Sequence, residues 1–365
     1  MQPGDVWQNS AAVTTLVLYG ADANAAAEYL QTLPNFKWHG PMASLGFRTE
    51  RARELSNAAA FSTLGHRPTS NLIPIAAMSL AQYTIVKQLA PAIYGKVLLC
   101  VDNTTMAKVA VKCMSTQAIA KKRSIKGNHA VHEDATMERK VMHKLSDSGC
   151  HPNILQLLKD FQENGQDHLV LEYCSQGELF DLVINCPNGR LSLKQSQEYF
   201  FQIASAVSFM HARGVAHCDL SLENVLVNSQ GECKLCDFGL ATDLHKVKVD
   251  AVGKFFYMAP EMYLKSCFAP GPADVWSLGI MLFIMVTGTP LFKKANDDDP
   301  TFDYFQENGL RCMLAWWNMD HLFPESVLDL LERMLEVNPT KRMTMQQLMA
   351  SEFMQPISDP SLFHA

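Results

Sequence analysis

The sequence has no excess of positive charge and no long hydrophobic segment. Its 31 lysines and arginines are outnumbered by 37 aspartates and glutamates, which gives a formal net charge of −6. Nucleic acids and membrane surfaces select basic proteins, so we expect neither as a partner. The longest apolar run, residues 278–286, is far shorter than the ~20 residues that a membrane-spanning helix needs. We therefore expect no membrane segment.

The chain also lacks the features of a secreted protein. Asp5 stands where a signal peptide would carry positive charge, and no apolar stretch follows it. Ten cysteines in 365 residues, without a secretory signal, favour reduced thiols over a disulfide framework. Cys233 and Cys236 have the CxxC spacing of a zinc site, but no second pair or histidine set accompanies them. We expect a monomer in the cytoplasm or the nucleus.

Two different patterns divide the rest of the chain. Residues 1–80 are alanine-rich with balanced charges, and we expect this N-terminal extension to be weakly ordered. Short β-rich runs follow at residues 83–89, 95–102, 108–114 and 168–174. Helical spacing of apolar residues marks 135–145, 192–213, 273–286 and 324–335. A strand-rich half followed by a helix-rich half predicts an α+β, two-lobed architecture.

Residues able to bind a nucleotide and a metal occur at several points among these predicted strands and helices. Lys112 ends the strand VAVK, and Glu138 in the next helix is placed to pair with it and hold its ammonium against phosphates. Asp219 and Asn224 share the segment HCDLSLEN, and Asp237 opens the segment DFG. The oxygens of Asn224 and Asp237 are ligands that Mg²⁺ prefers, and Asp219 could orient the proton of an attacking hydroxyl.

In their order, these motifs resemble a eukaryotic protein kinase over residues 83–354. The likeness rests on VAVK, the helix glutamate, HPNIL, LVLEYC, HCDLSLEN, DFG, MAPE, DVWSLG and NPTKR, a set that chance would hardly order in this way. It implies the bilobal protein kinase fold, with an N-lobe at 83–173, a C-lobe at 174–354 and a short tail at 355–365. The sequence looks closest to the calcium/calmodulin-dependent and related Ser/Thr groups.

The resemblance also implies ligands and roles: ATP and Mg²⁺, and protein Ser or Thr hydroxyls as acceptors. Asp219 would be the catalytic base, Lys112 would bind phosphates while paired with Glu138, and Asn224 and Asp237 would hold Mg²⁺. The nucleotide pocket would be lined by Leu89, Ala90, Ala92, Gly95, Val97, Ala110, Lys112, Leu171, Glu172, Cys174, Glu178, Leu226 and Asp237.

Within that pocket, Leu171 would be the gatekeeper and residues 172–174 the hinge that reads adenine. Glu178 would contact ribose or a substrate arginine. Outside it, Glu261 and Arg342 match the family's buried structural ion pair, and we expect them to matter for stability rather than for catalysis.

The phosphate-binding segments depart from the family pattern. The loop LAPAIYGKV keeps Gly95, but Ala90 and Ala92 replace two glycines, which predicts weakened rather than abolished ATP binding. Ser221 replaces a lysine that neutralises the transferred phosphoryl group, a loss that costs on the order of 10²-fold in rate. Lys254 is a candidate substitute, although a solvent-facing lysine is the simpler interpretation.

The activation loop departs as well. Cys218 replaces the arginine that clamps a phosphorylated activation loop in many kinases. Between Asp237 and Glu261 only Thr242 and Tyr257 carry hydroxyls, and Asp250 lies near the usual phosphorylated position. These features predict a kinase that needs no activation-loop phosphorylation.

Several features keep two interpretations open. Residues 121–123 and 297–299 are charge runs most simply read as solvated loops, but the acidic run, with Glu178 and Glu223, could favour basic substrates. Cys218 and Cys236 adjoin the site and would make it oxidation-sensitive if their pKa were lowered. The chain as a whole fits an active Ser/Thr kinase, or a pseudokinase that binds nucleotide or scaffolds partners.

Overall fold

The first half of the folded region is a five-stranded antiparallel sheet. The computed structural model describes residues 78–127, 129–147, 149–248, 252–264 and 267–355, so the predictions made for the N-terminal extension, Asp250 and the tail beyond 355 lie outside the described residues. The strands lie in the order β1-β2-β3-β5-β4. Their bounds are β1 Tyr83–Ala92, β2 Gly95–Asp102, β3 Lys108–Ser115, β4 Leu157–Glu163 and β5 Gln166–Glu172.

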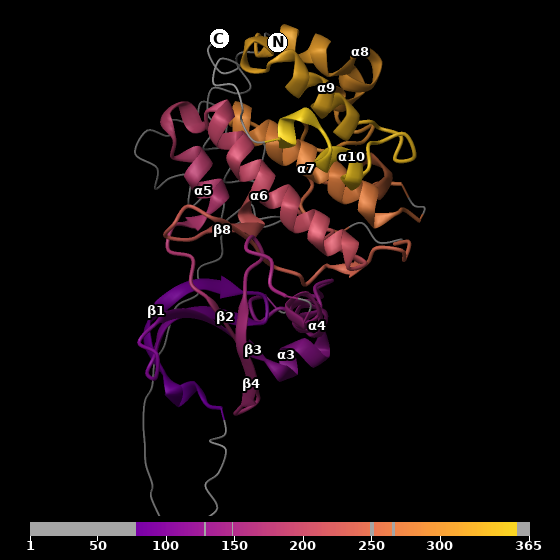
Figure 1. Ribbon diagram of the computed structural model, residues 1–365. Coiled ribbons are helices and arrows are strands. Elements are labelled where there is room, and N and C mark those ends of the chain that lie inside the picture. Colours follow the sequence, from indigo (N-terminus) through magenta and orange to yellow (C-terminus); the bar gives the residue numbers. More distant parts are fainter. Residues whose placement is uncertain (1–77, 128, 148, 249–251, 265–266, 356–365) are drawn as a thin grey trace, which may run out of the picture. The chain divides into compact units, whose positions relative to one another are not determined.

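Both faces of this sheet pack partly against other residues, and the alternating side chains of β3 show which residues each face contacts. Val109, Val111 and Cys113 face one apolar cluster, whereas Ala110 and Met114 belong to the main core of the protein. Because side chains alternate along a strand, Lys112 shares the second face. That face is the one covered by α4 (Ala135–Asp147), which lies with α3 (Thr116–Lys121) beside the sheet (Figure 1).

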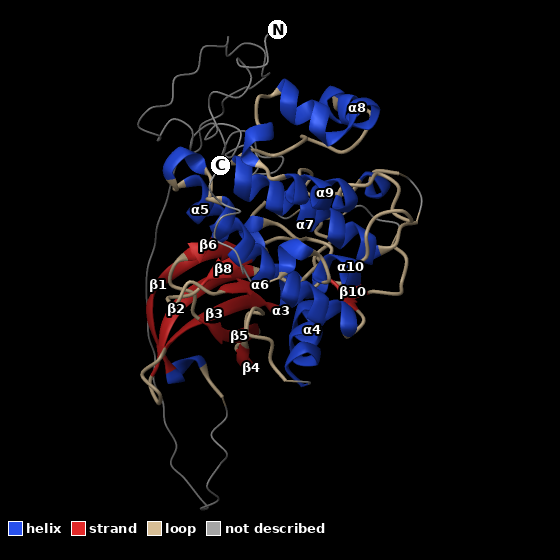
Figure 2. Ribbon diagram, turned by 45° about the horizontal axis from the view of Figure 1, so that its top comes forward, coloured by secondary structure: helices blue, strands red, loops and turns tan. Residues whose placement is uncertain are grey.

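The second half is mainly helical and also contains a short three-stranded sheet, β6-β8-β9, and a strand pair, β10-β7 (Figure 2). Its longer helices are α5 Leu179–Ile184, α6 Leu193–Ala212, α7 Pro270–Thr287, α8 Pro300–Trp316, α9 Glu325–Met334 and α10 Met345–Met349. The short strands are β6 Gly177–Glu178, β7 Val215–Ala216, β8 Val225–Val227, β9 Cys233–Leu235 and β10 Thr242–Asp243. One-turn 3₁₀ helices lie at Leu80–Gln82, Pro187–Gly189, Leu222–Asn224, Pro260–Met262, Asp320–Leu322 and Glu352–Met354. The predicted α+β, two-lobed fold is confirmed.

Helix α7 runs through the centre of the helical lobe. Among the described residues it is the one helix long and apolar enough to cross a membrane by length and composition, yet 89% of that window is buried inside the protein. A helix that is apolar on all sides and enclosed in this way is a core helix. It ends at Gly288, whose φ of +75° is the left-handed conformation that glycine adopts readily.

The predicted ion pair between Glu261 and Arg342 is present and buried. Arg342 Nη1 and Nη2 donate to Glu261 Oε1 and Oε2 at 2.7 and 2.8 Å, and the Arg342 side chain is fully enclosed. Further donation to the carbonyl oxygens of Pro272 and Glu336 satisfies the guanidinium. Two charges out of water are tolerated only with such complete pairing.

Removing one partner of this pair should destabilise the protein strongly. In Glu261→Gln the Arg342 charge stays buried without its carboxylate, and we expect the free energy of unfolding to fall by about 3–5 kcal/mol. Urea denaturation followed by tryptophan fluorescence measures the change. If the single variant does not fold, Glu261→Gln/Arg342→Met, which removes both charges, should be the more stable protein.

Arg311 provides the matched control. It pairs with Glu325, Asp329 and Glu332, but on the surface, where ion pairs contribute less than about 1 kcal/mol. A loss in Arg311→Gln as large as that in Glu261→Gln would contradict the assignment of Glu261–Arg342 as the stabilising pair.

Candidate active site

The predicted contact between Lys112 and Glu138 is formed. Lys112 Nζ on β3 lies 2.7 and 2.8 Å from the two carboxylate oxygens of Glu138 on α4. Burial alone would lower the pKa of Lys112, but the negative charges of Glu138 and Asp237 outweigh it and raise that pKa. The lysine is therefore a fixed cation, held by Glu138 and also within the electrostatic reach of Asp237.

Asp219 and Asn224 form a tight pair in the loop that precedes β8. Asn224 Nδ2 donates to the carbonyl oxygen of Asp219 at 2.7 Å and to its carboxylate Oδ2 at 2.8 Å. Because the amide N–H groups are used in this way, the Asn224 side chain presents its oxygen as an acceptor. The other carboxylate oxygen of Asp219, Oδ1, is buried without a hydrogen-bond partner. Burial raises the pKa of Asp219, which the charge of Lys254 opposes.

Asp237 lies two residues after the end of strand β9, in a segment bonded to the one that carries Asn224. The backbone N–H of Cys236 donates to the carbonyl oxygen of Asn224 at 2.9 Å, which ties the two segments together. Asp237 has a φ of +63°, and the next residue, Phe238, is fully buried against His217. Burial opposes ionisation of Asp237, but the positive charge of Lys112 keeps its pKa below the usual value.

The oxygen atoms of Asn224 and Asp237 fit a magnesium ion. Both are hard donors, and Asp237 is held ionised. Within the described ranges no group of three or more His, Cys, Asp or Glu side chains is arranged around a metal position. Mg²⁺ is commonly held by one or two protein oxygens together with substrate phosphates and waters, so two donors suffice.

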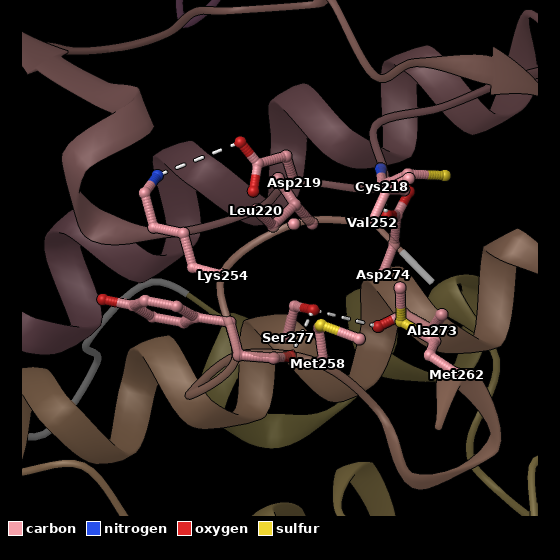
Figure 3. Close-up of a pocket in the computed structure, with 12 residues that line it drawn as sticks. Cys218, Asp219, Leu220, Val252, Lys254, Met258, Met262, Ala273, Asp274 and Ser277 are labelled. Carbon is pink, nitrogen blue, oxygen red and sulfur yellow. Dashed lines mark hydrogen bonds and ion pairs between the residues drawn. The ribbon is translucent and has the colours of Figure 1, made fainter. Parts of the chain in front are cut away.

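Lys254 reaches into this group from the activation segment. Its Nζ lies 2.8 Å from Ser221 Oγ, 3.4 Å from Asn224 Oδ1 and 3.9 Å from Asp219 Oδ2. Figure 3 shows the side chain directed at Asp219, while the Cys218 sulfur points the other way. The interpretation of Lys254 as an ordinary solvent-facing residue is therefore wrong.

The phosphate loop between β1 and β2 is a tight hairpin. Ala92 pairs with Gly95, and a Cβ at Gly95 would lie 1.9 Å from the carbonyl oxygen of Cys113, so only glycine fits there. Ala90 is exposed on β1. The Ile93 carbonyl oxygen at the tip accepts the N–H of Ile125, which comes from the segment between α3 and α4.

Two residues at this hairpin were not predicted from the sequence. Tyr94 is buried, and its hydroxyl donates to the carbonyl oxygen of Glu133. The side-chain carbons of Glu133 pass against Gly239, next to Asp237. Burial, reinforced by the charge of Asp237, raises the pKa of Glu133 to about 8. No sequence signal marks either residue, because the contact depends on how residues 122–127 and 129–134, between α3 and α4, pack on the hairpin.

The predicted nucleotide-pocket residues are brought together only in part. Ala110 pairs with Leu171 across β3 and β5, both belong with Cys174 to the main core of the protein, and Val97 and Leu226 pack against that core. Leu89, by contrast, lies on β1 with 38% of its surface exposed, outside that cluster.

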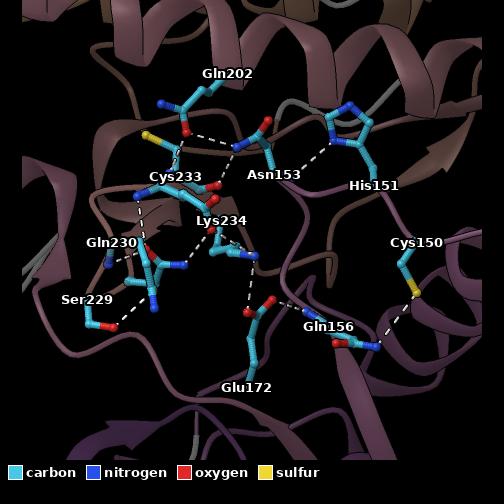
Figure 4. Close-up of polar contacts among 12 residues, drawn as sticks. Cys150, His151, Asn153, Gln156, Glu172, Gln202, Ser229, Gln230, Cys233 and Lys234 are labelled. Carbon is cyan, nitrogen blue, oxygen red and sulfur yellow. Dashed lines mark hydrogen bonds and ion pairs between the residues drawn. The ribbon is translucent and has the colours of Figure 1, made fainter.

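The segment predicted to be the hinge is held at Glu172 by its side chain as well as by its backbone. Glu172 accepts from the backbone N–H of Gln156 at 2.8 Å and pairs with Lys234 at 3.2 Å (Figure 4). Lys234 lies on β9 of the helical lobe, so this ion pair braces the two lobes at the end of β5. Glu178 lies one short strand further on, where burial and then the charge of Asp181 raise its pKa to about 7.

The cysteines near the site do not have lowered pKa values. Burial raises the pKa of Cys218 and of Cys236, and the Cys236 sulfur lies 3.3 Å from the carbonyl oxygen of Asn224. The condition for oxidation sensitivity, a stabilised thiolate, is therefore not met.

Comparison with known proteins agrees with this geometry. The family model for the protein kinase domain matches residues 83–354. The chain belongs to the protein kinase family. It is 31% identical over 289 residues to CBL-interacting protein kinase 9 of Oryza sativa subsp. japonica, covering 78% of this chain and 59% of that protein.

Two further relatives come from other plants. The kinase chain is 31% identical to CBL-interacting serine/threonine-protein kinase 12 of Arabidopsis thaliana, over 76% of this chain and 53% of that protein. It is 33% identical to calcium-dependent protein kinase 4 of Solanum tuberosum, over 73% and 46% respectively. The chain thus spans about half the length of the curated relatives it matches.

Thiol reactivity should follow burial in the folded kinase. At pH 8 we expect iodoacetamide to modify the exposed Cys150, Cys267 and Cys312 well before the buried Cys218 and the half-buried Cys236, because the raised pKa of both thiols leaves little thiolate to react. Peptide mass spectrometry over a time course gives the rates, and the urea-unfolded protein, in which all should react alike, is the control. Early labelling of Cys236 in the folded protein would contradict the geometry.

Proposed function

We propose that this protein is an active kinase that transfers the γ-phosphate of ATP to Ser or Thr hydroxyls of protein substrates, with Mg²⁺. The observation that carries the proposal is the ion pair between Lys112 and Glu138. In protein kinases this pair and the metal-binding aspartate must be in place together for phosphoryl transfer, and here Lys112 is paired with Glu138 at 2.7 Å while the charge of Asp237 helps to raise its pKa.

The residues support a direct transfer. The substrate hydroxyl oxygen forms a bond to the γ-phosphorus, the bond from that phosphorus to the bridging oxygen breaks, and ADP leaves. The carboxylate of Asp219, which Asn224 Nδ2 orients, would accept the hydroxyl proton. Asn224 and Asp237 would hold Mg²⁺, whose charge offsets that of the phosphates, and Lys112 would bind the phosphates of ATP.

Acidic side chains beside the site favour basic substrates. Glu178, Asp181 and Glu223 interact closely enough to raise the pKa of Glu178 to about 7, burial being the largest cause. A substrate arginine would relieve this repulsion and supply donors to carboxylates. The acidic run at residues 297–299 contributes less to substrate preference. Asp299 is already used, because it caps α8 by accepting from the N–H of Thr301 and also accepts from the N–H of Lys293.

We further propose that the kinase works without activation-loop phosphorylation. Cys218 is buried in an apolar cluster with Ala216 and Val252, so the position that binds a phosphorylated loop in many kinases here holds the loop by apolar contact. Of the two hydroxyls in the segment, that of Tyr257 is buried and donates to Glu223 at 3.0 Å.

A radiolabelled-ATP assay on a generic basic protein tests the enzyme proposal. We expect Mg²⁺-dependent labelling of serine and threonine, identified by phosphoamino acid analysis, and a loss of 10²-fold or more, roughly, in Asp219→Asn, which lacks the base. Equal labelling by both proteins would contradict the proposal. If Mg²⁺-ATP then still raised the melting temperature, the pseudokinase interpretation would replace it.

Phosphatase treatment tests the second proposal. Active kinase should keep its turnover number after treatment, and Thr242→Ala, which removes the half-buried hydroxyl on β10, should be as active as the wild type. Activity that falls with a phosphate lost from residues 238–260, located by mass spectrometry, would show that the loop must be modified.

A further inference from the structure

We propose that Lys254 is a catalytic residue that supplies, from the activation segment, the positive charge that the catalytic loop lacks at Ser221. The inference rests on the proposed kinase function and names a contact to the phosphoryl group undergoing transfer. It concerns a single ammonium group and the oxygens around it.

The backbone brings Lys254 to the catalytic loop. Gly253, with a φ of +101°, lies so close to the loop that a Cβ there would be 3.1 Å from Asp219 Oδ1 and from the carbonyl oxygen of Cys218. The N–H of Tyr257 donates to the carbonyl oxygen of Lys254 at 2.9 Å, closing a turn. The hydroxyl of Tyr257 in turn donates to Glu223 in the catalytic loop, so this turn is fixed on both sides.

The contacts of the ammonium leave it partly available. A lysine has three N–H donors. Ser221 Oγ at 2.8 Å takes one of them, Asn224 Oδ1 makes only a long contact at 3.4 Å, and Asp219 Oδ2 at 3.9 Å is an ion-pair distance beyond hydrogen-bond range. At least one donor thus remains for an anionic oxygen placed beside Asp219.

The ammonium lies beside a carboxylate and stays accessible. Asp219 Oδ2 is 3.9 Å from Lys254 Nζ, and the Lys254 side chain keeps 29% of its surface exposed, so a ligand can reach it.

The contact between Ser221 and Lys254 explains why a lysine at either position would place its ammonium group at the same oxygens. Its side chain is fully buried and its Oγ touches Lys254 Nζ. A lysine at 221 would extend from that point towards the same oxygens. One ammonium at a time suits the site, because two would repel each other.

A charge-relocation experiment tests the inference with four proteins: wild type, Lys254→Thr, Ser221→Lys, and the double variant Ser221→Lys/Lys254→Thr. We expect Lys254→Thr to lower kcat on the order of 10²-fold, as for a lost charge-stabilising contact. The double variant should recover most of that loss, and Ser221→Lys alone should not exceed the wild type. Lys246→Thr, which removes an exposed lysine of the same segment, is the matched control and should be unaffected.

Nucleotide binding gives a second readout without turnover. The melting temperature is measured with Mg²⁺ and either ADP or a non-hydrolysable ATP analogue. The extra stabilisation by the analogue over ADP, which reports the γ-phosphate, should shrink in Lys254→Thr and return in the double variant, while the ADP effect stays constant.

The outcomes separate this inference from the proposed function. Full kcat in Lys254→Thr overturns it. A loss of kcat that the double variant does not restore, with no change in the difference between analogue and ADP, makes Lys254 a structural brace and also overturns it. A wild type without turnover defeats the proposed function instead, and the analogue-against-ADP difference then decides the role of Lys254 by itself.

Discussion

The site depends on one buried carboxylate, that of Asp274 at the start of α7. A carboxylate removed from water is costly unless hydrogen bonds replace its hydration. Asp274 is 1% exposed and accepts from His211 on α6 at 2.8 Å and from the backbone N–H groups of His217 and Cys218 at 2.8 and 2.9 Å. These bonds fix the backbone of the catalytic loop, including the φ of +63° at Cys218, and so aim Asp219 into the site.

Because Asp274 binds the backbone N–H groups of the catalytic loop, the side chain of residue 218 can make other contacts. Here it is a cysteine that packs on Val252 of the activation segment. That contact places the following two residues over the catalytic loop, where Lys254 meets Ser221. Cys218, Ser221 and Lys254, which depart from the family pattern, therefore act together. The apolar contact of Cys218 holds the activation segment in place, and that segment carries Lys254, the cation that the catalytic loop lacks at Ser221.

The sequence predicted most of this frame, and the misses have physical causes. The helices at 135–145 and 192–213 show sustained apolar spacing and appear as α4 and α6, the latter begun by a capping box at Ser192. Helix α8 was missed because Gly309, with a φ of +79°, interrupts it and breaks the period. The contact between Lys112 and Glu138 was predictable from ordered motifs, whereas that between Tyr94 and Glu133 depends on the irregular segments 122–127 and 129–134, which carry no periodic pattern.

The same segments change the interpretation of the phosphate loop. Loss of two glycines suggested that alanine methyl groups would hinder the approach of phosphate. Ala90 lies exposed on β1, however, and the hairpin continues through the Ala92–Gly95 pair. Its tip is held by the N–H of Ile125 on one side and by the buried Tyr94 on the other. A loop fixed at both sides has little freedom to lose if it covers a nucleotide, as the proposed function requires, so the tethers would offset part of the cost of replacing glycine with alanine.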